Sequence, residues 1–342
     1  MSTDMIPELS IIIPAFNRVD LLRYTLQSVR EAIQNTSTEI LIVDDGSDEP
    51  LESQLKEFSS LPIQFLRQKN QGLVLSKNNG LNLAKGEYVL FLDSDDLIHK
   101  DKIDLQLEAM RHHRAEVSYS DVAITSLDKP FEDLKTTPLH SYSTETSPER
   151  FYFNVQPLPH SPIYRTDYIK EKLSSPIVPA SAIFNPIGEV WMYYNLSIFP
   201  ATIVHVSKPL TILTQHEEER ITRHWERQGV ASLSLGILFE QHCPRNEQSV
   251  RALQLLGENT FSAFRRLPHH FHPIFSEKML ALWRRCPKGH SATLGGRMFQ
   301  LLALILGPVG AARLLRLYQR PHYREIQTIS QEELQILVDS LP

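Results

Sequence analysis

The chain has 342 residues, 42% of them hydrophobic and 22% charged, which are the proportions of a folded soluble protein of one or two domains. Its two cysteines, Cys243 and Cys286, exclude a fold built on disulfides and suit a reducing compartment. The net charge is −12 over residues 1–219 and +7 over residues 220–342, and an acidic front half excludes a typical nucleic-acid binder, so no nucleic-acid partner is expected.

The first 120 residues alternate between short apolar runs, typical of buried strands, and stretches with apolar residues at helical spacing. The predicted strands cover residues 9–13, 39–43, 63–66, 88–92 and 116–119. The predicted helices between them cover residues 20–34, 50–60, 76–85 and 101–113. This alternation implies right-handed crossovers, so we predict an α/β fold with a mostly parallel sheet.

The rest of the chain has a different pattern. Residues 121–148 are rich in Ser, Thr and Pro and predict an irregular connection, and residues 151–214 mix short helices and strands. From residue 221 the pattern is helical to the end, with breaks at Pro244, Pro268, Pro287, Pro308 and Pro321. We therefore predict a first domain over residues 1–220 and a helical C-terminal region over residues 221–342.

Polar side chains follow three of the predicted strands where each strand ends. Asn17 follows the first strand, Asp44 and Asp45 end the second, and Asp93-Ser94-Asp95-Asp96 follows the fourth. Ligands of parallel sheets bind beyond the carboxyl ends of the strands, and crowded carboxylates are the ligands that hard divalent cations prefer. The alternative is that the acids after the fourth strand form the cap and first turn of the next helix.

Four segments resemble a known family when they are taken in order and spacing. They are residues 10–17 (SIIIPAFN), 42–47 (IVDDGS), 70–80, which contains NQG and KNNG, and 84–96 (AKGEYVLFLDSDD). They are similar to the inverting nucleotide-sugar glycosyltransferases of GT-A (Rossmann-like) fold, the family that includes cellulose and chitin synthases. The resemblance implies that residues 1–120 bind the nucleotide-sugar and residues 121–220 the acceptor, and it fades after about residue 225.

The resemblance also implies roles for individual residues. Asp45, together with Asp44, would accept a hydrogen bond from the base, and the N–H of uracil makes a UDP-sugar the leading donor. Lys77 stands where the family usually has Arg and would face the pyrophosphate. The implied metal site for Mn²⁺ or Mg²⁺ consists of Asp95, Asp93 and His216. The implied donor site consists of Pro14, Ala15, Asn17, Asp44, Asp45, Asn70, Gly72, Lys77, Asp93 and Ser94.

The catalytic base is where the sequence departs from the family. A bound divalent cation would neutralise the departing diphosphate, while a carboxylate would take the proton of the attacking acceptor hydroxyl. The family usually provides that carboxylate as the Asp of a Glu-Asp pair, but this chain has Glu189-Val190. Either Glu189 acts as the base, or the pair lies a few residues away, or the protein is a non-catalytic nucleotide-binding relative that serves as an assembly subunit.

Two other enzyme classes fit the sequence less well. A nucleotidyltransferase would need a Gly-rich basic loop after the first strand, where this chain has Pro14-Ala15-Phe16-Asn17. A dinucleotide-dependent oxidoreductase would need the pattern G-x-G-x-x-G at that place. The nearby histidines 269, 270 and 272 have no partner ligands at metal-binding spacing and predict a loop.

Residues 298–312 form an uncharged, mostly apolar segment in the basic C-terminal region. We expect a buried core helix there, and the alternative is an in-plane membrane anchor with Arg313, Arg316 and Arg320 at the headgroups. The acidic first eight residues do not have the pattern of a secretory signal, which predicts a cytoplasmic protein, with peripheral contact at the inner face of the membrane as the alternative. The common uses of the family suggest a glycan or lipid-linked acceptor in bacterial surface glycan assembly.

Overall fold

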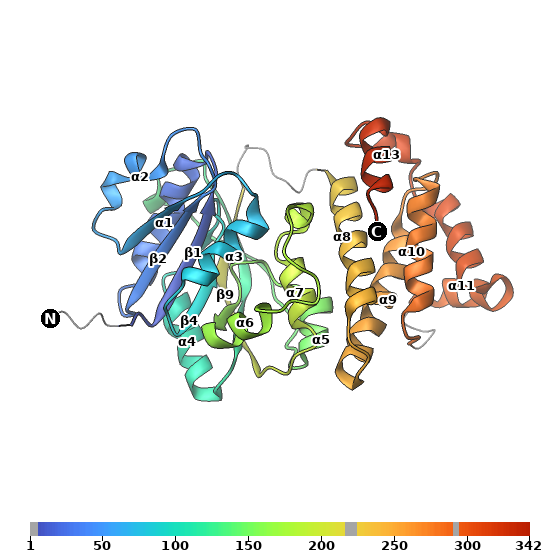
Figure 1. Cartoon of the computed structure of the whole chain (residues 1–342), viewed down its shortest axis with the longest axis horizontal. Coiled ribbons are helices and arrows are strands. Elements are labelled where there is room, and N and C mark those ends of the chain that lie inside the picture. Colours follow the sequence, from blue (N-terminus) through green and yellow to red (C-terminus); the bar gives the residue numbers. More distant parts are fainter. Residues whose placement is uncertain (1–5, 216–223, 290–293) are drawn as a thin grey trace.

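The computed structural model describes residues 6–215, 224–289 and 294–342. The sheet and its helices form one side of the molecule, and the helices that follow residue 224 form the other (Figure 1). Between them lie the short helices of residues 148–196. The prediction of an α/β fold with a helical C-terminal region is confirmed.

The first four strands form the parallel part of the sheet, in the order β3-β2-β1-β4. They are β1 (Leu9–Ala15), β2 (Thr38–Asp44), β3 (Ile63–Arg67) and β4 (Tyr88–Phe91). Ala15 pairs with Asp44, and Ile12 pairs with Phe91. This register brings the carboxyl ends of β1, β2 and β4 to the same edge of the sheet.

Beyond β4 the sheet is mixed. β8 (Ile163–Arg165) is antiparallel to both β4 and β6 (Val117–Ser126), whereas β6 runs parallel to β9 (Ile203–Gln215). β5 (Leu97–Ile98) pairs with β9, and β7 (Thr137–His140) pairs with β6. The prediction of an irregular segment over residues 121–148 is therefore partly wrong, because the Ser- and Thr-containing end of β6 is paired along its length with β9.

Helices cover both faces of the parallel strands, which explains their uninterrupted apolar runs. α1 (Val19–Ala32) and α4 (Lys102–His113) pack on the face that contains Ile11 and Ile13. α3 (Leu73–Leu83) packs on the opposite face with Ile12. The shorter elements are α2 (Leu51–Gln54), η1 (Lys56–Phe58), η2 (Phe131–Asp133), α5 (Pro148–Arg150), η3 (Phe151–Val155), α6 (Thr166–Leu173), η4 (Ala182–Ile187) and α7 (Val190–Leu196).

The C-terminal helices are α8 (Trp225–His242), α9 (Glu247–Arg266), α10 (Pro273–Arg285), α11 (Arg297–Gln319), α12 (Tyr323–Ile326) and α13 (Gln331–Asp339). Four of the five predicted proline breaks fall between helices. Pro308 lies inside α11, where Gly307 has a non-helical backbone with a φ of 69° and kinks the helix. Phe153 and Tyr194 pack against Phe239, so the two sides of the molecule share one core.

Candidate functional site

The polar segments that follow β1, β2 and β4 meet at one edge of the sheet, as the sequence predicts. The Asn17 amide donates a hydrogen bond to Asp48 Oδ2 at 3.1 Å, which joins the first two segments. Arg18 Nη1 donates to Asp95 Oδ2 at 2.7 Å, which joins the first segment to the third. Parallel strands impose this meeting, because their carboxyl ends all point to the same edge.

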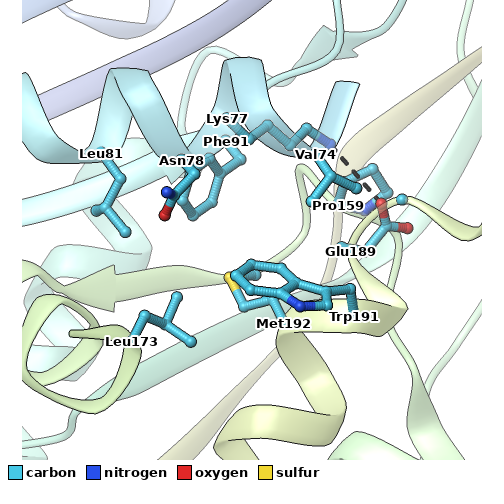
Figure 2. Close-up of a pocket in the computed structure, with 11 residues that line it drawn as sticks. Val74, Lys77, Asn78, Leu81, Phe91, Pro159, Leu173, Glu189, Trp191 and Met192 are labelled. Carbon is cyan, nitrogen blue, oxygen red and sulfur yellow. Dashed lines mark ion pairs between the residues drawn. The ribbon is translucent and has the colours of Figure 1, made fainter. Parts of the chain in front are cut away.

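A buried lysine links the acids after β4 to the predicted base. Lys77 extends from α3 and places Nζ 2.8 Å from Asp93 Oδ1. The same Nζ lies 3.7 Å from Glu189 Oε2 (Figure 2). The side chains are 9%, 23% and 20% exposed, respectively, so all three charges are largely shielded from water. Residues that lie far apart in the chain thus form one ionic cluster, which we call the Lys77 cluster.

The pKa values within the Lys77 cluster shift in opposite directions. Burial raises the pKa of Glu189 above the value of an ordinary glutamate, although the charge of Lys77 opposes this shift. Burial also disfavours the charge of Asp93, but the ion pair and hydrogen bond with Lys77 prevail and lower the pKa of that carboxyl. Asp93 is therefore the permanent partner of Lys77, and Glu189 is the more basic carboxylate, as a proton acceptor requires.

The three acids that follow β4 differ in burial, since Asp93 and Asp95 are partly exposed and Asp96 is buried. Asp96 is buried, accepts a hydrogen bond from the Thr214 backbone N–H at 2.9 Å and lies 3.5 Å from His160 Nδ1. Asp95 and Asp93 are more exposed and flank the buried Ser94. The alternative that these acids cap the next helix is wrong, since β5 intervenes and Asp101 is the first residue before α4.

The arrangement fits a hard divalent cation. The described side chains around the end of β4 include four carboxylates, of Asp93, Asp95, Asp96 and Glu189, against the two cations Arg18 and Lys77. His160 adds no charge, because burial lowers its pKa to about 3. Carboxylate oxygens in such an excess suit Mn²⁺ or Mg²⁺. Asp93 and Asp95 would hold the ion. Asp95 would then bind the metal in place of its present partner Arg18.

Asp44 and Asp45 are buried and hold the loops that the resemblance assigns to the nucleotide. Asp45 accepts hydrogen bonds from the backbone N–H groups of Gln71 and Gly72 at 2.9 and 2.7 Å, and from the side chain of Gln68. Asp44 accepts from the backbone N–H of Ser47 at 2.9 Å. Any hydrogen bond from a base would add to these contacts.

Gly72 also has a structural role beside Asn185. Its φ is +85°, and an added Cβ would lie 1.8 Å from the Asn185 side chain. Asn185 Oδ1 in turn accepts from the Val74 backbone N–H at 3.0 Å, so this asparagine caps the start of α3. Gly72 thus admits Asn185, which explains why α3 begins at Leu73 and not at the predicted residue 76.

The structure places the remaining predicted residues as follows. Pro14 and Ala15 are buried at the end of β1, and Asn17 and Asn70 are exposed beside it. Asn17 has a φ of 52°, which turns the chain away from the sheet. His216 lies outside the described residues. The sequence analysis missed Arg18, His160 and Asn185, because no local pattern shows that each meets a residue far along the chain.

An apolar pocket lies beside the Lys77 cluster. Figure 2 shows Trp191 and Met192 of α7 below it, with Leu81 of α3 and Leu173 of α6 on its side. Trp191 is fixed by a hydrogen bond from its indole N–H to the Val178 carbonyl at 2.8 Å. The first residues of α7 thus contribute both Glu189, at its cap, and the apolar lining next to it.

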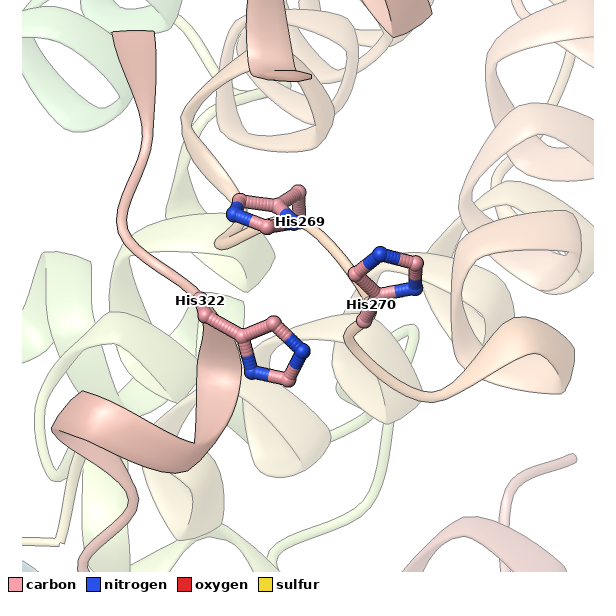
Figure 3. Close-up of side chains that lie close together, drawn as sticks. All are labelled: His269, His270 and His322. Carbon is pink, nitrogen blue, oxygen red and sulfur yellow. The ribbon is translucent and has the colours of Figure 1, made fainter. Parts of the chain in front are cut away.

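Three histidines come together on the helical side of the molecule. His269 and His270 follow α9, His322 follows α11, and their ligand nitrogens lie within 4.8 Å of one another (Figure 3). His322 Nδ1 accepts a hydrogen bond from the Arg324 backbone N–H at 3.2 Å. The Arg316 guanidinium donates to the Pro268 carbonyl beside His269. Because these surroundings are cationic, we assign no ion to this group.

Residues 10–171 match the family described as Glycosyl transferase family 2. A solved structure of S. aureus TarS, residues 1–349, has the same fold with a TM-score of 0.63. The comparison covers 94% of this chain and 93% of that chain at 17% sequence identity, so it establishes the GT-A fold and its helical extension alone.

Several bacterial glycosyltransferases are similar to part of the chain. An uncharacterized glycosyltransferase of Rickettsia bellii (strain RML369-C) is 31% identical over 146 residues, which are 42% of this chain and 20% of that protein. TuaG of Bacillus subtilis (strain 168), whose description names teichuronic acid biosynthesis, is 32% identical over 37% of this chain and 51% of its own length. The chain therefore spans about a fifth of the first relative and about half of the second.

The opposite pKa shifts predict opposite effects on stability. A lowered pKa means that ionised Asp93 stabilises the fold above its unfolded pKa, and this contribution is lost as the pH falls through the folded pKa. A raised pKa means that ionised Glu189 lowers the free energy of unfolding as the pH rises from its unfolded to its folded pKa. In urea unfolding at neutral pH, Asp93→Asn should lower the free energy of unfolding by about 1–3 kcal/mol, which is less than the loss expected when a fully buried ion pair is broken.

Glu189→Gln should leave the free energy of unfolding unchanged or raise it, because it removes the disfavoured charge. Glu87→Gln is the matched control, since Glu87 pairs with Arg165 at the surface and is 55% exposed, and its effect should stay within about 0.5 kcal/mol. A larger loss of stability from Glu189→Gln than from Asp93→Asn would contradict the assignment of the charges.

Proposed function

We propose that the protein transfers a sugar from a UDP-sugar to an acceptor hydroxyl, with inversion at the anomeric carbon and with the help of Mn²⁺ or Mg²⁺. One observation carries the proposal: Lys77, Asp93 and Glu189 meet at the carboxyl edge of a family 2 sheet, beside Asp95. The site then combines three functions: Asp93 and Asp95 for the metal, Lys77 for the diphosphate, and Glu189 as the base.

The donor class is supported by the related fold. TarS residues 1–349 have been solved in complex with UDP and with UDP-GlcNAc, and these structures cover 95% and 94% of this chain at TM-scores of 0.61 and 0.58. In this chain Asp45 organises residues 68–72 at the edge of the sheet where β1, β2 and β4 end. We infer that the uridine lies against this loop and the end of β1, with Asn17 and Asn70 exposed beside it.

The metal would be held by Asp93 and Asp95, with His216 as the further ligand that the resemblance implies. When bound, the ion supplies positive charge for the diphosphate that leaves. Lys77 supplies a second, fixed positive charge on the same side. Its pKa is raised, because the attraction of Asp93 and Glu189 outweighs the effect of burial, so the amine stays protonated at neutral pH.

Transfer needs a single displacement. A lone pair of the acceptor oxygen forms the bond to the anomeric carbon while the bond from that carbon to the diphosphate oxygen breaks. Glu189 takes the proton of the acceptor hydroxyl, and its raised pKa suits this task. The displacement inverts the anomeric configuration, because attack and departure occur on opposite faces. Val190 has no acid group, so Glu189 replaces the usual Asp of the family.

We place the reaction in surface glycan assembly on the cytoplasmic side of the cell, with a glycan or lipid-linked acceptor. The similarity to TuaG supports this setting, since the description of that relative names teichuronic acid biosynthesis. The alternative of a nucleotidyltransferase has no support from the family match. The alternative of a non-catalytic relative rests on Val190. It predicts that the protein binds the nucleotide but does not transfer a sugar.

Isothermal titration calorimetry tests the donor site. UDP should bind in the presence of Mn²⁺, and removal of the metal with a chelator should weaken the binding. Asp95→Ala should weaken metal-dependent binding by about tenfold or more, as expected when a charged contact is lost. Asp101→Ala is the matched control, because this exposed acid lies six residues further along the chain, before α4 and outside the site. Equal UDP affinity with and without metal would contradict the metal role.

The base is tested by kinetics and by the product anomer. Release of UDP from a UDP-sugar should rise with pH through a pKa above the usual glutamate value of 4.5, because the base must be ionised. Glu189→Gln should reduce the rate by about 10²–10⁴-fold and leave UDP affinity intact. NMR of the product should show the inverted anomer, and a retained anomer or a full rate in Glu189→Gln would overturn this mechanism.

A further inference from the structure

The first half of α11 exposes a continuous apolar face. Met298, Leu301, Leu304 and Ile305 are 55%, 66%, 84% and 82% exposed. At about 100° per residue, these side chains fall on one face of the helix, opposite the buried Phe299. The expectation of a buried core helix over residues 298–312 is therefore wrong. α11 lies at the end of the molecule farthest from the parallel strands (Figure 1).

The opposite face of α11 fixes the direction of this apolar face. Phe299 packs against Phe261, with ring centroids 6.0 Å apart, and the Arg265 guanidinium lies 4.3 Å above the Phe299 ring. Beyond the kink at Gly307, Ala311 and Ala312 are buried. Both halves of α11 are thus held against the rest of the protein. The apolar face could turn inward only if these contacts were lost.

The surroundings of α11 are cationic. Between Glu277 and Glu325 the chain has nine Lys or Arg residues and no Asp or Glu. Arg313 pairs with Glu277 at 2.6 Å, and Arg316 is buried and donates to the carbonyls of Leu267 and Pro268. Arg297, at the start of the helix, is exposed and makes no ion pair within the described parts of the chain. An anionic surface would therefore satisfy charges that the protein itself leaves uncompensated.

The geometry favours a helix that lies on a bilayer over one that crosses it. The 23 residues of α11 are long and apolar enough to span by composition, since an 18-residue stretch within the helix has a mean hydropathy of 1.7 and is 17% buried. The kink at Gly307 leaves ten residues before it, or about 15 Å of helix, which is half of the hydrocarbon thickness. The second half is held against α9, where the Arg316 guanidinium lies 5.0 Å from the centroid of the Phe264 ring, and is not free to extend the span.

We propose that the apolar face of residues 298–305 docks in the plane of an anionic lipid bilayer, with Arg297 and its basic neighbours at the headgroups. Large exposed apolar patches mark interaction surfaces, and a basic rim around one suits anionic lipid. A second copy of the chain is a poorer occupant. Symmetric pairing of this face would bring the same cations of both copies together. If the proposed function holds, docking would also bring the enzyme to lipid-linked acceptors.

Sedimentation with vesicles tests the docking directly. The full chain should sediment with vesicles that contain phosphatidylglycerol and far less with pure phosphatidylcholine, and high salt should weaken the binding. The double variant Leu304→Ser/Ile305→Ser should bind about tenfold or more weakly, since it removes the two most exposed apolar side chains of the face. Its thermal unfolding should match that of the wild type, because neither side chain is buried.

The matched control is Leu139→Ser/Ile336→Ser, which removes two apolar side chains that are 51% and 63% exposed on β7 and α13. It should bind vesicles as the wild type does. The proposal is wrong if the wild type ignores anionic vesicles, or if both double variants bind equally well. Light scattering that shows a dimer disrupted by Leu304→Ser/Ile305→Ser would assign the face to a second copy. UDP binding is measured in parallel and is expected to be the same in all variants, so failure of docking leaves the proposed function standing.

Discussion

The ion pair between Lys77 and Asp93 is the contact on which the candidate site depends. It joins the acidic segment after β4 to α3 and brings both to Glu189 at the cap of α7. A lysine with so little exposure needs compensating negative charge, and two carboxylates supply it. The same pairing separates the two acids chemically. Asp93 stays ionised as the partner of Lys77, and Glu189 keeps a raised pKa that suits a base.

The sheet and its loops prepare this contact. Asp45 holds residues 68–72 through backbone N–H groups, and Asn185 caps α3 from the segment that precedes Glu189. The start of α3 is therefore fixed both by Asp45 of the parallel part of the sheet and by Asn185 of the later segment. Because of this double attachment, movement of the Asn185–Glu189 segment would alter the position of Lys77 and, through it, of Asp93.

The two ends of the molecule differ in what they leave unsatisfied. At the end of β4 the described side chains have more carboxylates than cations, which favours a divalent metal. Around α11 cations outnumber acids in the sequence and large apolar side chains are exposed, which favours an anionic lipid surface. Under our two proposals, the protein binds a soluble donor at one end and rests on a bilayer at the other.

The sequence by itself determined the parallel strands and the meeting of Asn17, Asp45 and Asp95, because strand ends are local signals and parallel pairing sends them to one edge. It did not reveal that Arg18 holds Asp95 or that Asn185 occupies the space at Gly72, since these pairs are separated by 77 and 113 positions and have no local pattern. It also misjudged α11, because an apolar segment has the same composition whether neighbours cover it or not. Only the tertiary structure decides which apolar and charged groups pack or pair within the protein. The groups that do not are the ones available to a ligand.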